Sequence, residues 1–212
     1  MNSHMSIFSI VFITLFLVLL CPINLAKASP ADYSKEKSIY DQLVKEYDID
    51  KAKMTGGEPI NKLELMFKGY ALDAVDFTNQ NFKKQLNFSE DSIKDVEECL
   101  DALSRTRAQY KPTNEQLYNT AKMYAGYIGQ VIKLKWGGDW RDESEYSLEN
   151  GPALKINDQQ LFLVSKIYRR IVNGPEDNIW HFYLIFKKDM ESSSTTKPDR
   201  INGRASTGAT DG

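Results

Sequence analysis

Cysteine is scarce in this chain of 212 residues, which contains only Cys21 and Cys99. Cys21 lies in an N-terminal segment that we expect to be removed, and a single remaining cysteine cannot form an internal disulfide even in an oxidising compartment. We therefore expect packing alone to stabilise the fold. Cys99 lies beside the apolar stripe of a predicted helix among acidic residues, which favours a buried and unreactive thiol.

Histidine is equally scarce, because His181 is the only one beyond the N-terminal segment. A zinc site of several histidines, or a catalytic pair built on a second histidine, is therefore excluded. The sequence also lacks a glycine-rich phosphate loop and the ligand pattern of an EF-hand. We expect no cofactor and no metal site, and we interpret His181 as a hydrogen-bonded structural residue.

Acidic residues outnumber basic residues only slightly. The full chain has 27 basic and 29 acidic residues, and loss of Lys27 with the N-terminal segment leaves 26 basic residues and a formal charge of about −3. This balance gives no electrostatic reason for binding nucleic acid, so we expect no nucleic-acid partner.

The one long hydrophobic run extends from Ile7 to Leu20. It is shorter than the roughly 20 residues that span a bilayer, and Ala26-Lys27-Ala28 places small residues at both positions that a signal peptidase reads. We interpret residues 1–28 as a signal peptide that is cleaved after Ala28. This predicts a periplasmic or secreted protein without a permanent membrane anchor, and the bulky Leu20 before Cys21 disfavours lipidation.

Apolar residues at helical spacing predict four helices in the first part of the mature chain, at about 33–49, 61–84, 89–103 and 113–135. Ser89 is the expected cap of the third helix, and Thr113 with Gln116 forms a capping box for the fourth. Gly126 and Gly129 each disfavour the fourth helix by about 1 kcal/mol relative to alanine. We therefore expect another helix or strand to approach closely at these glycines.

The spacing of the apolar residues changes after Trp140 from a helical to a strand-like pattern. Segments 152–156 and 159–163 flank Asn157-Asp158 and predict a hairpin, followed by a short helix that Ser165 caps and that ends near Gly174. Alternation over 178–186, which includes His181, predicts a final strand. The predicted fold is α+β: a helical N-terminal layer of about four helices packs with a small antiparallel β-sheet in one domain over 29–190. Residues 191–212 predict a disordered tail.

Acidic residues gather between positions 139 and 149, namely Asp139, Asp142, Glu143, Glu145 and Glu149. A glycosidase needs two carboxyl groups at a defined separation, which sequence does not reveal. An exposed acidic loop is therefore one interpretation, and the active site of a small cell-wall hydrolase is the other.

A second group of residues suggests recognition of a protein, because arginine and aromatic side chains are common interface anchors. The candidate protein-binding residues are Trp140, Tyr168, Arg169, Arg170, Glu176 and Asp177. Alternatively, the two arginines pair with Glu176 and Asp177 at the surface, a contact that contributes little to stability.

A series of short motifs runs through residues 88–187: Phe88-Ser89, Ser92-Ile93, Val96-Glu97, the stretch 124–129, Gly137-Gly138-Asp139-Trp140, Gly151-Pro152-Ala153-Leu154 and the stretch 164–174. In these motifs the chain resembles a bacterial family of uncharacterised small domains. The resemblance implies a small stand-alone or accessory domain without an assigned reaction, and it extends as an expectation to immunity proteins that act against toxins.

The predicted signal peptide, the slightly acidic mature domain and the lack of a recognisable catalytic motif together predict a non-enzymatic binding protein of the periplasm. The most concrete form of this hypothesis is an immunity protein that occludes the active site of a cognate toxin effector. Two alternatives stay open: a small cell-wall hydrolase that uses carboxylates of the 139–149 loop, and a structural or ligand-carrying accessory protein.

Overall fold

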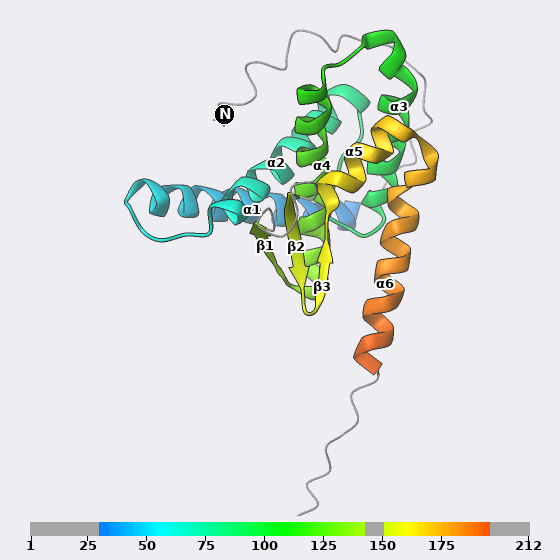
Figure 1. Ribbon diagram of the computed structural model, residues 1–212. Helices are drawn as coiled ribbons and strands as arrows, with labels where there is room; N and C mark the ends of the chain where they lie inside the picture. The colour runs from blue at the N-terminus through cyan, green and yellow to red at the C-terminus, as the bar shows by residue number, and fades with distance from the viewer. Residues whose placement is uncertain (1–29, 143–150, 196–212) are drawn as a thin grey trace, which may run out of the picture. The chain divides into compact units, whose positions relative to one another are not determined.

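The structure is a computed structural model that describes residues 30–142 and 151–195, with side chains over 39–142 and 151–193 (Figure 1). The predicted signal peptide and residues 196–212 of the predicted tail lie outside the described residues. The chain divides into two compact units, Met1–Trp180 and His181–Gly212. No described helix is both long and apolar enough to cross a membrane.

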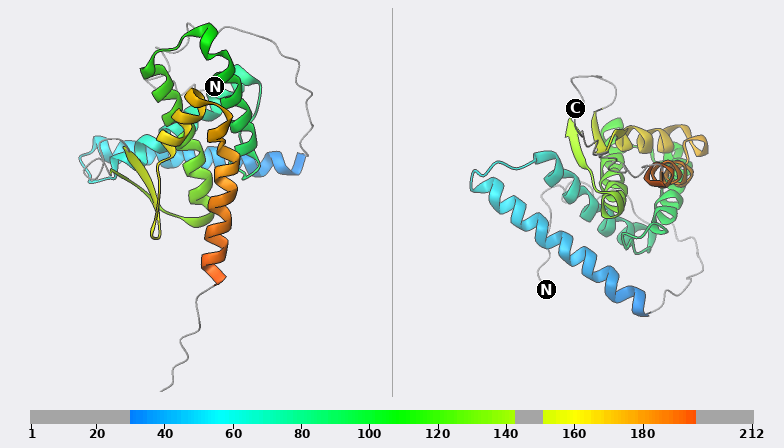
Figure 2. Two further views of the ribbon diagram at one scale, coloured as in Figure 1. Left: turned by 45° about the vertical axis from the view of Figure 1, so that its right-hand side comes forward. Right: turned by 90° about the horizontal axis from the view of Figure 1, so that it is seen from below.

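Helices make up most of the unit Met1–Trp180, and together with the small sheet they confirm the predicted α+β class. The four predicted N-terminal helices are α1 (Pro30–Thr55), α2 (Lys62–Phe82), α3 (Ser92–Tyr110) and α4 (Asn114–Trp136); α5 (Leu163–Asn173) and the short 3-10 helix η1 (Pro175–Asp177) come after the sheet. Helix α1 is longer at both ends than the predicted 33–49. Helix α2 contacts α1 and α4, while α5 contacts α3 and α4 (Figure 2).

The serines that the sequence offers as helix caps do not cap their helices. Helix α3 begins at Ser92, and Ser89 forms the preceding turn, in which its Oγ accepts the Ser92 N–H at 3.2 Å. Phe88 has a φ of 59° and donates its N–H to the Tyr127 hydroxyl at 2.7 Å, so a tertiary contact determines this entry to the helix. Ser165 lies inside α5 and does not cap it.

The sheet has three antiparallel strands in the order β1-β2-β3. They are β1 (Asp139–Asp142), β2 (Pro152–Ile156) and β3 (Gln159–Leu161). The predicted hairpin is confirmed as β2 and β3, and Asn157 in its turn has a φ of 52°. Strand β1 was not predicted, and it pairs with β2 through Trp140 opposite Leu154.

The predicted final strand over 178–186 is wrong, because this segment begins helix α6 (Ile179–Thr195). Its bulky aromatic and β-branched residues favour strands only weakly, since strand preference depends on the surface that a segment packs against. The apolar residues Ile179, Tyr183, Phe186 and Met190 also recur at helical spacing. His181 is therefore an exposed helical residue, and residues 191–195 of the predicted tail continue α6.

Helix α4 begins with the predicted capping box, in which Thr113 Oγ1 accepts the Gln116 N–H and Gln116 Oε1 accepts the Thr113 N–H. The expected close approaches at its glycines are also confirmed. A Cβ atom on Gly126 would lie 2.6 Å from the Phe67 carbonyl oxygen of α2, and one on Gly129 would lie 2.6 Å from the Trp140 ring. The two glycines thus allow α2 and β1 to pack against α4.

We expect Gly126→Ala to lower the free energy of unfolding by about 2 kcal/mol. The added methyl group meets the backbone of α2, and overpacking of this kind costs about 1–3 kcal/mol, more than the gain of about 1 kcal/mol in helix propensity. Gly69→Ala in α2 is the matched control, because its Cβ would meet only the Tyr47 ring at 3.1 Å. Urea unfolding of both variants measures the difference, and equal stabilities would contradict the close contact.

Cys99 of α3 is buried with 1% of its surface exposed, as predicted. Burial raises the pKa of its thiol to about 12. The reactive thiolate is therefore scarce at neutral pH, which fits a small hydrophobic core residue.

Candidate protein-binding face

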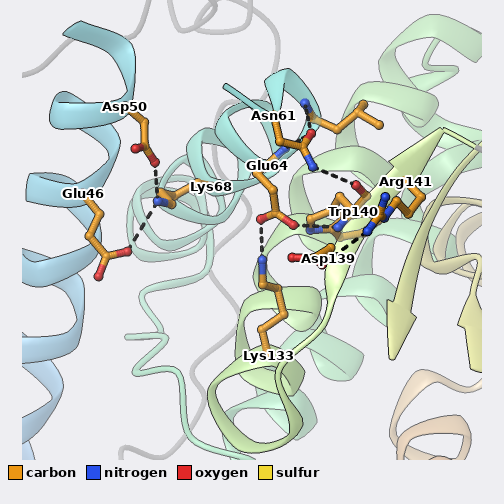
Figure 3. A network of polar contacts seen from close by, with 10 residues as sticks. Glu46, Asp50, Asn61, Glu64, Lys68, Lys133, Asp139, Trp140 and Arg141 are labelled. Carbon is orange, nitrogen blue, oxygen red and sulfur yellow. Dashed lines mark hydrogen bonds and ion pairs between the residues drawn. The ribbon is translucent and has the colours of Figure 1, made fainter. Parts of the chain in front are cut away.

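Trp140 is a core residue and not the exposed interface anchor that the sequence predicts. Its side chain is 2% exposed, and its ring stacks on Phe67 with 3.6 Å between the centroids. Its backbone N–H donates to Glu64 at 2.6 Å, and its carbonyl accepts from the Asn61 side chain at 3.1 Å (Figure 3). Glu64 also forms an ion pair with Lys133 of α4. Trp140 therefore holds β1 against α2 and α4.

The acidic 139–149 loop is described only in part. Asp139 and Asp142 belong to β1 and are exposed, while Glu143, Glu145 and Glu149 lie outside the described residues. Asp139 lies 3.6 Å from Arg141 on the same strand. Over residues 39–142 and 151–193, no group of three or more histidine, cysteine, aspartate or glutamate side chains is arranged to hold a metal ion.

Arg170 is also buried, contrary to its predicted place on a binding surface. Its side chain is 2% exposed and connects α5 to α3, because Nε donates to Glu97 at 2.7 Å and Nη2 donates to Asp101 at 2.9 Å. The other oxygen of Glu97 accepts the Ile179 N–H at the start of α6. The alternative prediction, that Arg170 pairs with Glu176 or Asp177, is therefore also wrong.

Arg169 does form the predicted surface pair. It is exposed, and its Nε lies 3.8 Å from Asp177. Asp177 also accepts from Lys166 at 2.8 Å and from Asn173 at 3.0 Å. Burial opposes ionisation of Asp177, but the bonds from Lys166 and Asn173 outweigh it and lower the pKa of this carboxyl. Glu176 is exposed in η1. These charges are largely satisfied within α5 and η1.

Tyr168 belongs to a different part of the surface, which we call the tyrosine face: Tyr118, Lys122 and Tyr168. The Tyr118 ring meets the Tyr168 ring edge-on at 6.4 Å and is 39% exposed. Lys122 places its Nζ 4.7 Å from the centroid of the Tyr118 ring. Two tyrosines and a cation from two packed helices thus lie together on a rigid support.

The sequence interpretation identified Tyr168 but missed Tyr118 and Lys122. These two residues are one helical turn apart on α4, where an aromatic and a cation at that spacing are neighbours. This spacing in the sequence could have predicted the contact between Tyr118 and Lys122. The contact with Tyr168 depends on how α4 packs against α5, which no local pattern reveals.

Helix α2 carries a half-buried carboxyl group, that of Asp73. Burial and the neighbouring Asp76 raise the pKa of Asp73 from 3.8 to about 6. Asp76 accepts from the Tyr40 hydroxyl of α1 at 3.3 Å. The pKa values of Tyr47 of α1 and Tyr70 of α2 are raised mainly by burial and further by the charge of Asp73. The pKa of Tyr40 is raised by burial, then by Asp76, and to a smaller extent by Asp73.

We expect Asp73→Asn to stabilise the protein at pH 7.5 by about 1 kcal/mol. The folded protein binds this proton more tightly than the unfolded chain, so stability is lost as the pH rises from 3.8 to about 6. A pKa difference of about 2 corresponds to about 3 kcal/mol for a fully buried group, and solvent screening reduces it here.

Thermal melts at pH 4 and pH 7.5 check this expectation, with Asp158→Asn in the exposed hairpin turn as the control for net charge. The gain should appear at pH 7.5 and shrink at pH 4. A variant that is no more stable than the wild type at pH 7.5 would show that burial does not disfavour the Asp73 charge.

No family model, no curated protein and no solved structure matches the chain. The resemblance of residues 88–187 to a bacterial family stays a prediction. The geometry of the described residues is therefore the structural basis for a functional proposal.

Proposed function

We propose that the protein is a non-enzymatic binding protein of the periplasm, and that it neutralises a toxin effector as an immunity protein by covering the toxin's active site. The tyrosine face is the single observation that carries the binding proposal. Tyrosine supplies a large amphipathic contact area and is enriched among the residues that dominate binding energy at protein interfaces.

The helices α4 and α5, which carry the tyrosine face, are held in place by their own packing. This favours binding of a partner without rearrangement of the face. Tyr118 and Lys122 are on α4, a helix with a capping box and a largely buried apolar side. Tyr168 is on α5, which Arg170 ties to α3. Such preorganised side chains lose little conformational freedom when a partner binds. The periplasmic location rests on the predicted signal peptide and its cleavage after Ala28.

The test screens the products of the genes that neighbour this one as candidate toxins. We expect Tyr118→Ala to weaken the complex by about 2–4 kcal/mol, the range of interface hot spots. Its effect on the free energy of unfolding should stay below about 1 kcal/mol, because the side chain is 39% exposed. Calorimetric titration and thermal melts measure the two quantities.

Leu134→Ala is the matched control, because it truncates an exposed side chain on the same helix, with 52% exposure. It should leave binding unchanged. Equal affinities for wild type and Tyr118→Ala with a confirmed toxin would remove the tyrosine face from the interface. If no neighbouring toxin binds, and a cell-wall hydrolytic activity is lost when Asp139 and Asp142 are both replaced by asparagine in a folded protein, the hydrolase alternative replaces this proposal.

A further inference from the structure

Half-buried lysines in the unit Met1–Trp180 usually have a carboxylate partner. Four of them form such ion pairs: Lys68 with Asp50 at 2.7 Å, Lys84 with Asp95 at 2.6 Å, Lys133 with Glu64, and Lys166 with Asp177 at 2.8 Å. Figure 3 shows the pairs of Lys68 and Lys133. This pattern follows from the cost of removing an ammonium group from water without an opposite charge beside it.

Lys122 departs from this pattern. It is half-buried, yet none of the described residues places a carboxylate within 4.0 Å of its Nζ. Its hydrogen-bond acceptor is the side-chain oxygen of Asn119 at 3.4 Å, a long contact. Burial lowers the pKa of Lys122, and the charge of Glu115 on the same helix opposes that effect from beyond pairing distance.

The surroundings of Lys122 fit an incoming anion. Its Nζ lies over the Tyr118 ring, which orients the ammonium and limits its contact with water. The neighbouring Tyr168 ring, set edge-on to Tyr118, adds a second aromatic surface beside it. A carboxylate that reached Nζ would complete the pairing seen at the other half-buried lysines, and it would do so on a surface that is already partly shielded from solvent.

We propose that Lys122 binds an acidic side chain of the protein partner, which places a carboxylate against the tyrosine face. This inference rests on the proposed function, because it names the chemistry of the partner that the same face takes. The toxin surface that meets Tyr118 and Tyr168 therefore carries an aspartate or a glutamate.

The probe is a terminally blocked tetraglutamate peptide, added to the whole protein with 13C-labelled lysines and followed by NMR. We expect a saturable shift of the Lys122 signal that high salt weakens. Lys122→Met should weaken peptide binding by about fivefold or more, while Lys122→Arg retains it because arginine also pairs with carboxylates. Lys45→Met, at an exposed lysine of α1, should leave binding unchanged.

Binding that persists in Lys122→Met, or the lack of a saturable shift at Lys122, would overturn the proposal. A blocked tetralysine peptide should produce no shift at Lys122, and an equal shift would also overturn it. These results are separate from those of the Tyr118→Ala test. If the toxin loses affinity for Tyr118→Ala but the tetraglutamate peptide does not act at Lys122, the tyrosine face is supported as the interface. The proposed pairing of Lys122 with an acidic side chain is then wrong. If the peptide binds at Lys122 but the toxin binds Tyr118→Ala as tightly as the wild type, the anion site at Lys122 is supported and the proposed function is wrong.

Discussion

Arg170→Met is expected to lower the free energy of unfolding by about 3–5 kcal/mol, because removal of one partner leaves a buried ion pair uncompensated. Arg170 is 1% exposed, and Glu97 and Asp101 both accept its hydrogen bonds. Without it, Glu97 keeps only the Ile179 N–H among its described partners, in a site that water hardly reaches. Urea unfolding followed by circular dichroism measures the loss.

The neighbouring arginine is a close control for this experiment. Arg169→Ala removes a side chain that is 58% exposed and lies 3.8 Å from Asp177, so the loss should be at most about 1 kcal/mol. Glu97→Gln combined with Arg170→Met should recover part of the stability, because the amide oxygen still accepts a hydrogen bond and no charge is left unpaired at position 97. Similar losses for Arg169→Ala and Arg170→Met would contradict the buried network.

Trp140→Ala is expected to cost about 3–5 kcal/mol, the range for truncation of a buried aromatic side chain. The substitution removes the ring that stacks on Phe67 and fills the space above Gly129. Both contacts join β1 to the helices, so the loss should combine a cavity with a weakened attachment of the sheet. Urea unfolding followed by far-ultraviolet circular dichroism measures it without relying on tryptophan fluorescence.

Two further variants show whether the effect belongs to the Trp140 site. Trp140→Phe keeps an aromatic ring on Phe67 and should lose less than the alanine variant. Trp136→Ala, at a half-buried position near the end of α4, should cost less because less apolar surface returns to water. If Trp140→Ala were no worse than Trp136→Ala, the stacked indole would not be part of the core.

The candidate site was predictable only in part. Arg169 and Asp177 are close along the chain and form the surface pair that one prediction expected, whereas Tyr168 lies on the separate tyrosine face. Trp140 and Arg170 have the same residue types but are buried, because their partners Phe67 and Glu97 lie more than 70 positions away. Residue type alone does not distinguish an interface anchor from a core anchor.

The sequence alone was sufficient to predict the elements that depend on interactions between residues a few positions apart. The capping box at Thr113 specifies the start of α4, and Asn157 with its flanking segments specifies the hairpin. The α+β class followed from these periodicities. Strand β1, the left-handed Phe88 and the pairing of Tyr118 with Tyr168 were decided by tertiary packing instead. In each of these the local preference is weak or mixed, and contacts between residues distant in the chain contribute more free energy than the choice between helix and strand.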